Sequence, residues 1–155
     1  MPISDDGDRA TDASRTDVVI AIIARSGKVL ICQRRKTGSF PGYWEFPGGK
    51  REAGETLEAC LIREVREELA LNVEPGVALG TTDHDYPGAR IRLHPYVCSC
   101  PSGDPLLLAC DAAKWVQPHD LTVYQFPPAN DSFIADVIEY FNRLTRPAPT
   151  ADDGR

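Results

Sequence analysis

Hydrophobic residues gather in runs along the first third of this chain and predict its opening elements. Residues 17–24 and 28–33 are apolar and rich in β-branched residues, and the short segment between them ends in Gly27. This pattern predicts a β-hairpin. Residues 36–43 contain two glycines and a proline, which predicts a loop after the hairpin.

The remaining hydrophobic pattern predicts a mixture of strands and helices. Apolar residues that recur every third or fourth position predict helices over residues 56–70 and 131–144. Pro95 lies within an alternating segment, so we expect that strand to be a sheet edge or to carry a bulge. The predicted strands after the hairpin cover residues 44–46, 77–86, 89–100 and 113–116. This mixed order predicts an α/β or α+β sandwich.

Length and charge limit the classes of protein that fit. At 155 residues the chain fits one domain with a real core, which we expect over residues 16–145 between disordered tails at 1–15 and 146–155. The net charge of −6 argues against stable nucleic-acid binding, which depends on clustered Lys and Arg. We see neither a signal peptide nor a membrane span and expect a cytoplasmic protein. The five cysteines lack a CxxC spacing and are expected to be small buried hydrophobes.

Three glutamates are the most informative polar residues. Glu64, Glu67 and Glu68 stand at positions i, i+3 and i+4 of the predicted helix, which makes them neighbours on one surface. Like charges at this spacing repel one another, and a divalent cation removes that cost. Because every candidate ligand is a carboxylate or carbonyl oxygen, Mg2+ or Mn2+ suits the site better than Zn2+. The alternative is a solvated helix whose arginines pair with these carboxylates.

The spacing around the glutamates resembles the signature of the Nudix hydrolases. Gly49, Glu55 and the run from Arg63 to Glu68 match the family pattern, whereas Ala70 stands where the pattern has a glycine. The resemblance implies the Nudix fold, a mixed β-sheet sandwiched between α-helices, and hydrolysis of a nucleoside diphosphate linked to another group. A glycine adopts positive φ without strain, so we expect a longer last helical turn or slight strain at Ala70.

The same resemblance implies the roles of the acidic site. Glu68 is the strongest candidate ligand, and Glu64 is either a ligand or the base that takes the proton of the attacking water. Many family members carry a further glutamate where this chain has Ala109, and Asp111 is the nearest acid to that position. Arg63 is expected to orient the carboxylate of Glu55 or Glu67. The implied catalytic and metal-binding residues are Gly48, through its backbone, Arg63, Glu64, Glu67 and Glu68.

The segment from Phe126 to Asn130 is similar to the one that reads the base in MutT-type 8-oxo-dGTP diphosphatases. The Asn130 amide offers a donor beside an acceptor, and 8-oxoguanine presents an O6 acceptor beside an N7–H donor, whereas guanine presents two acceptors. The alternative for Asn130 is a helix N-cap. The implied substrate-binding residues are Arg34, Glu45, Phe46, Pro47, Gly48 and Asn130. A surface position for Arg34 and ordinary core packing for Phe46 are equal alternatives.

These residues together predict a Mg2+-dependent nucleoside triphosphate pyrophosphohydrolase. We expect it to convert 8-oxo-dGTP to the monophosphate and pyrophosphate, an activity that cleans the nucleotide pool for DNA replication and repair. Hydrolysis of CTP, dCTP or another nucleoside diphosphate derivative is the alternative within the same fold. A nucleotide-binding module without catalysis is the alternative of another class. The sequence leaves open whether the protein is a monomer or a homodimer.

Overall fold

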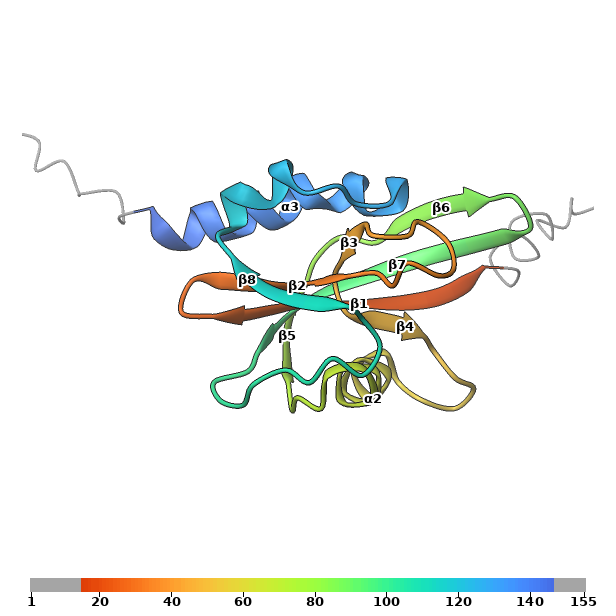
Figure 1. Cartoon of the computed structure of the whole chain (residues 1–155), viewed down its shortest axis with the longest axis horizontal. Coiled ribbons are helices and arrows are strands. Elements are labelled where there is room, and N and C mark those ends of the chain that lie inside the picture. Colours follow the sequence, from red (N-terminus) through yellow and green to blue (C-terminus); the bar gives the residue numbers. More distant parts are fainter. Residues whose placement is uncertain (1–14, 147–155) are drawn as a thin grey trace, which may run out of the picture.

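The structure, a computed structural model, describes residues 15–146 of the chain. The predicted disordered tails, apart from Arg15 and Arg146, lie outside the described residues. Within the described range the strands form one eight-stranded mixed sheet that lies between α2 on one face and α3 on the other (Figure 1). This arrangement confirms the predicted fold class. No helix in this range is long and apolar enough to cross a bilayer.

The elements follow one another in the mixed order that the sequence predicts. They are β1 (Thr16–Arg25), β2 (Lys28–Gln33), β3 (Trp44–Glu45), β4 (Gly48–Lys50), α2 (Leu57–Leu69), β5 (Glu74–Ala78), β6 (Thr82–Tyr86), β7 (Ala89–Ser99), β8 (Ala112–Val116), the 3-10 helix η1 (Pro118–Val123) and α3 (Pro128–Thr145). The main path through the sheet is β3-β2-β1-β7-β5, with β4 paired to β1, β6 to β7 and β8 to β2. The β1–β7 pair is parallel and the other pairs are antiparallel.

Strand β1 is apolar at successive positions because both of its faces are covered. Side chains alternate between the two faces of a strand, and those of Val19 and Ala21 join the cluster beneath α2, together with Leu61 and Val65 of that helix. The side chain of Ile22 joins the cluster beneath α3, which also contains Phe46, Phe126 and Phe133. A strand buried on both faces reads as a continuous apolar run rather than an alternating one.

Helix α2 has a defined start and a strained end. The Thr56 hydroxyl caps the first turn by accepting a 3.1 Å hydrogen bond from the Ala59 backbone N–H. At the other end Ala70 adopts a left-handed conformation, with φ 54°, and its N–H donates to the Arg66 carbonyl. Of the two expectations for Ala70, slight strain is the correct one. The helix ends at Leu69 without a longer last turn, and Ala70 adopts the left-handed conformation that a glycine would adopt without strain.

Three predicted elements differ from those observed. Gly48 and Gly49, which follow the strand predicted over residues 44–46, form part of a separate strand, β4, that pairs with β1. The strand predicted over residues 77–86 is two strands, β5 and β6, which pair with different parts of β7. Pro95 lies in that interior strand rather than at an edge, and its carbonyl accepts from the Leu79 N–H. The register of β5 shifts between Pro75 and Ala78, opposite residues 96–98, so the expected irregularity is close to Pro95 but on the partner strand.

Helix α3 begins three residues before the predicted start. Pro128 occupies the first helical position, which suits proline because the N–H it lacks would have no partner in the helix. The N-cap is Pro127 and makes no side-chain capping bond. Asn130 is therefore the third residue of the helix, and the alternative that it caps the helix is wrong.

Candidate functional site

Arg63 is the centre of the ionic network on the acidic surface of α2. Its guanidinium contacts both Glu55 oxygens, at 2.6 and 3.0 Å, and lies 2.9 Å from a Glu64 oxygen and 3.3 Å from a Glu67 oxygen. It also donates to the Lys50 carbonyl. The hydrogen bonds with Glu55 lower the pKa of that carboxyl to about 2 and raise the pKa of Arg63. Arg63 thus contacts both expected partners, Glu55 and Glu67, and Glu64 as well, and its role in orienting them stays a prediction.

Glu68 lies on the inner side of the same surface. Burial, together with the charges of Glu64 and Glu45, raises the pKa of its carboxyl to about 8, although a hydrogen bond with the Gly48 backbone lowers it. A hydrogen bond with Glu64 also contributes to the rise. Glu64, Glu68 and Glu45 thus form a crowded acidic group, and the sequence alone did not indicate that Glu45 belongs to it.

The two glycines of β4 make room for the protein rather than for a ligand. A Cβ at Gly48 would lie 2.0 Å from the carbonyl oxygen of Val19 in β1. A Cβ at Gly49 would lie 2.3 Å from the Glu64 carboxyl carbon. Glycine is therefore required at the first position for β1–β4 pairing and at the second for Glu64 to rest against the strand. The expectation that the Gly48 backbone binds the metal is compatible with this packing and stays a prediction.

The donor set fits a hard divalent cation. The candidate ligands are carboxylate oxygens and the Gly48 carbonyl, and a cation would relieve the repulsion that raises the Glu68 pKa. Among residues 15–146 no three acidic, histidine or cysteine side chains are already grouped as ligands. The physical reason is Arg63, since Glu64 and Glu67 both point to its guanidinium. Glu64 already reaches Glu68 by a hydrogen bond, so metal binding requires the Glu67 carboxylate to turn from Arg63 toward Glu68.

A pocket of about 620 Å³ lies under α3, next to the acidic site. Its floor is aliphatic and comes from alternate residues of β1 and β7, such as Ile20 and Ile91. Its polar lining includes three of the predicted substrate-binding residues, Arg34, Glu45 and Asn130. Because Glu45 lines this pocket and also raises the Glu68 pKa, the pocket and the acidic site adjoin one another through this residue.

Arg34 is held in place within the pocket wall. It lies 2.5 Å from a Glu45 oxygen and donates to the Ser39 carbonyl at 2.9 Å. The neighbouring Arg35 points elsewhere and donates to the Leu108 carbonyl. Arg34 is partly exposed but is paired with Glu45 and lines the pocket, and its contact with the substrate stays a prediction.

Phe46 and Pro47 have different surroundings. The Phe46 ring is buried, stacks on Phe126 with ring centroids 5.4 Å apart, and also lines the pocket, so both expectations for it hold together. Pro47 does not line this pocket, and its carbonyl accepts from the Ala21 N–H at 2.8 Å. The structure thus gives Pro47 a role in joining β1 to the segment before β4.

Asn130 lines the pocket from the first turn of α3. Its backbone N–H donates to the Pro127 carbonyl at 2.9 Å. Among the described residues no hydrogen bond occupies its side-chain amide. The donor and the acceptor of that amide therefore remain available to a ligand.

The segment that contains Ala109 offers few candidates for a further base. Asp111 is exposed, and its N–H donates to the Gln33 carbonyl at the start of β8. The preceding residues are fixed against α2, because the Leu108 N–H donates to the Glu68 carbonyl. Glu45, which reaches the acidic group from β3, is the additional carboxylate that the structure supplies in place of a late glutamate.

Two aromatic residues of the pocket carry no recognisable sequence signal. Phe40 lies in the loop between β2 and β3, and Tyr86 ends β6. Their ring centroids are 6.3 Å apart, so the pocket is bordered by two segments that are distant in the sequence. No spacing or composition rule links these positions before the fold is known.

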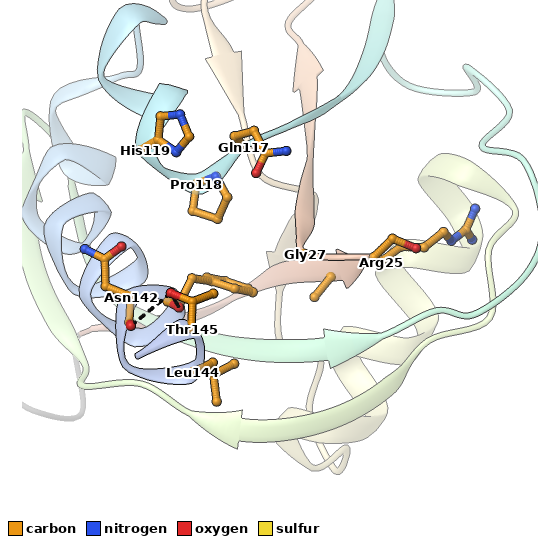
Figure 2. Close-up of a pocket in the computed structure, with 11 residues that line it drawn as sticks. Arg25, Gly27, Gln117, Pro118, His119, Asn142, Leu144 and Thr145 are labelled. Atoms are coloured by element: carbon orange, nitrogen blue, oxygen red, sulfur yellow. Dashed lines mark hydrogen bonds between the residues drawn. The ribbon is translucent and has the colours of Figure 1, made fainter. Parts of the chain in front are cut away.

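A second cavity, of about 350 Å³, lies at the turn between β1 and β2, beside η1 and the end of α3 (Figure 2). None of the predicted site residues lines it. Its Gln117 and His119 side chains are exposed, and its Arg25 donates to the Cys100 carbonyl at 2.6 Å. The predicted site residues therefore lie at the pocket beside the acidic group and not at this cavity.

Comparison with known proteins agrees with this geometry. The model of the NUDIX domain matches residues 18–136. The chain is 34% identical over 114 residues to the CTP pyrophosphohydrolase of Escherichia coli, covering 74% of this chain and 84% of that protein. It is also 34% identical over 108 residues to the 8-oxo-dGTP diphosphatase of Haemophilus influenzae, covering 70% and 79%.

The structural comparison leads to the same class of proteins. A solved MutT structure, from work on Aliivibrio salmonicida and Vibrio cholerae, superposes with a TM-score of 0.66 at 33% identity. The match covers 81% of this chain and 98% of that one. The sheet and the two helices thus form a fold that occurs in solved MutT proteins.

Proposed function

We propose that this chain, which belongs to the Nudix hydrolase family, is a divalent-metal-dependent pyrophosphohydrolase whose preferred substrate is 8-oxo-dGTP. The family hydrolyses phosphorus-containing anhydrides of nucleotides, and the chain resembles both 8-oxo-dGTP and CTP hydrolases. The products would be the nucleoside monophosphate and pyrophosphate. The observation that carries the proposal is the apolar pocket, with its unoccupied Asn130 amide, directly beside the acidic group of Glu45, Glu64 and Glu68.

The acidic residues divide the chemistry between them. Glu64, Glu67, Glu68 and the Gly48 carbonyl would hold Mg2+ or Mn2+, which when bound neutralises phosphate charge and lowers the pKa of bound water. Arg63 controls the orientation of Glu64 and Glu67 through its contacts at 2.9 and 3.3 Å. Glu64 rests against Gly49 and hydrogen-bonds Glu68, and it would serve either as a further metal ligand or as the base that takes a proton from the attacking water.

The pocket supplies the preference for the oxidised base. The aliphatic floor from β1 and β7 accepts a flat heterocycle, and Asn130 at the edge reads its hydrogen-bonding groups. One amide can satisfy both the O6 acceptor and the N7–H donor of 8-oxoguanine, whereas guanine offers two acceptors there. An unpaired polar group in the pocket costs about 1–3 kcal/mol, which corresponds to about tenfold discrimination or more.

Competition between substrates tests this assignment. With 8-oxo-dGTP and dCTP present together and Mg2+ in excess, we expect the oxidised purine to be consumed first. The Asn130→Asp variant replaces the amide donor with an acceptor, so it should lose at least about tenfold of this preference. Glu139→Gln in the same helix serves as the control, since Glu139 pairs with Arg143 away from the pocket. An unchanged preference in Asn130→Asp would contradict the proposed reading of the base.

The similarity to a CTP pyrophosphohydrolase favours a second candidate, in which the main substrate is CTP or dCTP. Faster consumption of dCTP in the same competition would select it. A binding module without catalysis predicts that no pyrophosphate is released from either nucleotide. Pyrophosphate release with Mg2+ that stops with EDTA excludes that module.

A further inference from the structure

Aromatic side chains form part of the wall of this pocket. Phe40 comes from the loop between β2 and β3, which reaches toward the hairpin of β6 and β7 (Figure 1). Its ring centroid lies 5.4 Å from that of Tyr43 and 6.3 Å from that of Tyr86. The Phe40 side chain is half-buried and lines the pocket. Phe40 therefore lines the same pocket as the aliphatic residues of β1 and β7.

The backbone of Phe40 is strained. Its φ is +50°, a left-handed conformation that bulky residues rarely adopt. Arg34 fixes this conformation from the preceding residue, since its guanidinium donates to the carbonyl and to the hydroxyl of Ser39, at 2.9 and 3.0 Å. The loop closes on Gly42, whose N–H donates to the Arg34 carbonyl. Strain of this kind persists where surrounding contacts impose it, and it concentrates at ligand-binding sites.

We propose that Phe40 binds the nucleotide by stacking its ring on the face of the base that the sheet leaves uncovered. The inference rests on the proposed function and adds a substrate-binding residue to it. A flat heterocycle would lie between the β1–β7 floor and the Phe40 ring, with its edge toward Asn130. Tyr86 supports the ring from the side. Stacking on Phe40 then contributes affinity for any nucleobase, while the hydrogen bonds of Asn130 with the edge of the base decide which base is preferred.

This division predicts a specific kinetic pattern. Phe40→Ala should raise KM for both 8-oxo-dGTP and dCTP by about 10- to 100-fold, the range for loss of one base-stacking aromatic residue. The larger effect should be on KM rather than on kcat. The ratio of the KM for 8-oxo-dGTP to the KM for dCTP should change little. Phe40→Tyr keeps the ring and should stay within about threefold of the parent KM.

Phe40→Gly separates binding from a structural role. Glycine tolerates the positive φ, so the variant should unfold at the same temperature as the parent or a higher one. It lacks the ring, so its KM should rise as much as in Phe40→Ala. A residue that only fills space would show a lower unfolding temperature in the glycine variant. A parent-like KM in a folded Phe40→Gly variant would overturn the inference.

Calorimetric binding of 8-oxo-dGMP, the monophosphate product, tests Phe40 without turnover. We expect the parent to bind it and both Phe40→Gly and Phe40→Ala to bind at least about tenfold more weakly. If the parent binds the monophosphate but hydrolyses no triphosphate, the proposed function fails. The affinities of the parent and the Phe40 variants for the monophosphate then still test the stacking by Phe40. If the parent hydrolyses 8-oxo-dGTP and the variants bind the monophosphate as tightly, stacking fails and the proposed function stands. If the parent binds neither nucleotide, both fail.

Discussion

Replacing Glu68 by glutamine should stabilise the metal-free protein while it removes the response to metal. In the parent, burial and the neighbouring Glu64 and Glu45 charges raise the Glu68 pKa from 4.5 to about 8. A carboxyl whose pKa is higher in the folded state than in the unfolded state stabilises the fold most at a pH below its pKa in the unfolded state. That contribution is lost as the pH rises toward the folded pKa. The metal-free parent should therefore lose stability between about pH 5 and pH 8.

The size of this effect follows from the two pKa values. Each unit is worth about 1.4 kcal/mol, so the full separation between 4.5 and about 8 corresponds to at most about 5 kcal/mol. Glu68 is only partly shielded from water, which screens the neighbouring charges, so we expect about 2 kcal/mol. For a chain of this size that difference is about 4–8 °C in the unfolding temperature.

Thermal unfolding in EDTA, scanned from about pH 5 to pH 9, measures the difference directly. The gap between Glu68→Gln and the parent should widen with pH, whereas the exposed Glu74→Gln control should follow the parent. Added Mg2+ should raise the unfolding temperature of the parent and of Glu74→Gln but not that of Glu68→Gln. A constant gap across this pH range, or an equal Mg2+ response in all three proteins, would refute the reasoning.

Three further substitutions have defined outcomes. Ala70→Gly should raise the unfolding temperature by about 2 °C, since glycine relieves the strain of the left-handed residue, and a lower value would contradict this reading of the helix end. Gly49→Ala should abolish pyrophosphate release, because its Cβ would meet the Glu64 carboxyl carbon at 2.3 Å. Gly80→Ala, where nothing lies within 4 Å, should keep full activity. Arg63→Lys should reduce kcat by about 10- to 100-fold through loss of the paired Glu55 contacts. Arg66→Lys should keep kcat within about threefold, because within residues 15–146 the Arg66 guanidinium contacts only the Asn72 side chain. Equal losses in both variants would argue against orientation by Arg63.

Local patterns predicted the parts of the fold whose cause is local. The spacing of Leu61, Val65 and Leu69 and the capping threonine at residue 56 define α2 without reference to other elements. The β1–β2 hairpin follows from two apolar runs and a short turn. The three glutamates on α2 depend only on helical periodicity, so the acidic surface was also predictable.

Other features depend on contacts between distant segments and left no local signal. Gly48 and Gly49 belong to a strand only because β1 lies beside them. The division between β5 and β6 depends on which part of β7 each one meets. Glu45 affects the Glu68 pKa only once the chain is folded, and so this relation does not follow from residue spacing.

The most direct measurement of the central claim is 31P NMR of the purified protein mixed with 8-oxo-dGTP and Mg2+. Signals of the nucleoside monophosphate and pyrophosphate should appear in equal amounts, stop when EDTA is added, and be absent with Glu68→Gln. Orthophosphate as the main product, release that continues in EDTA, or an equally active Glu68→Gln variant would contradict the claim that the acidic surface of α2 binds the metal for this hydrolysis.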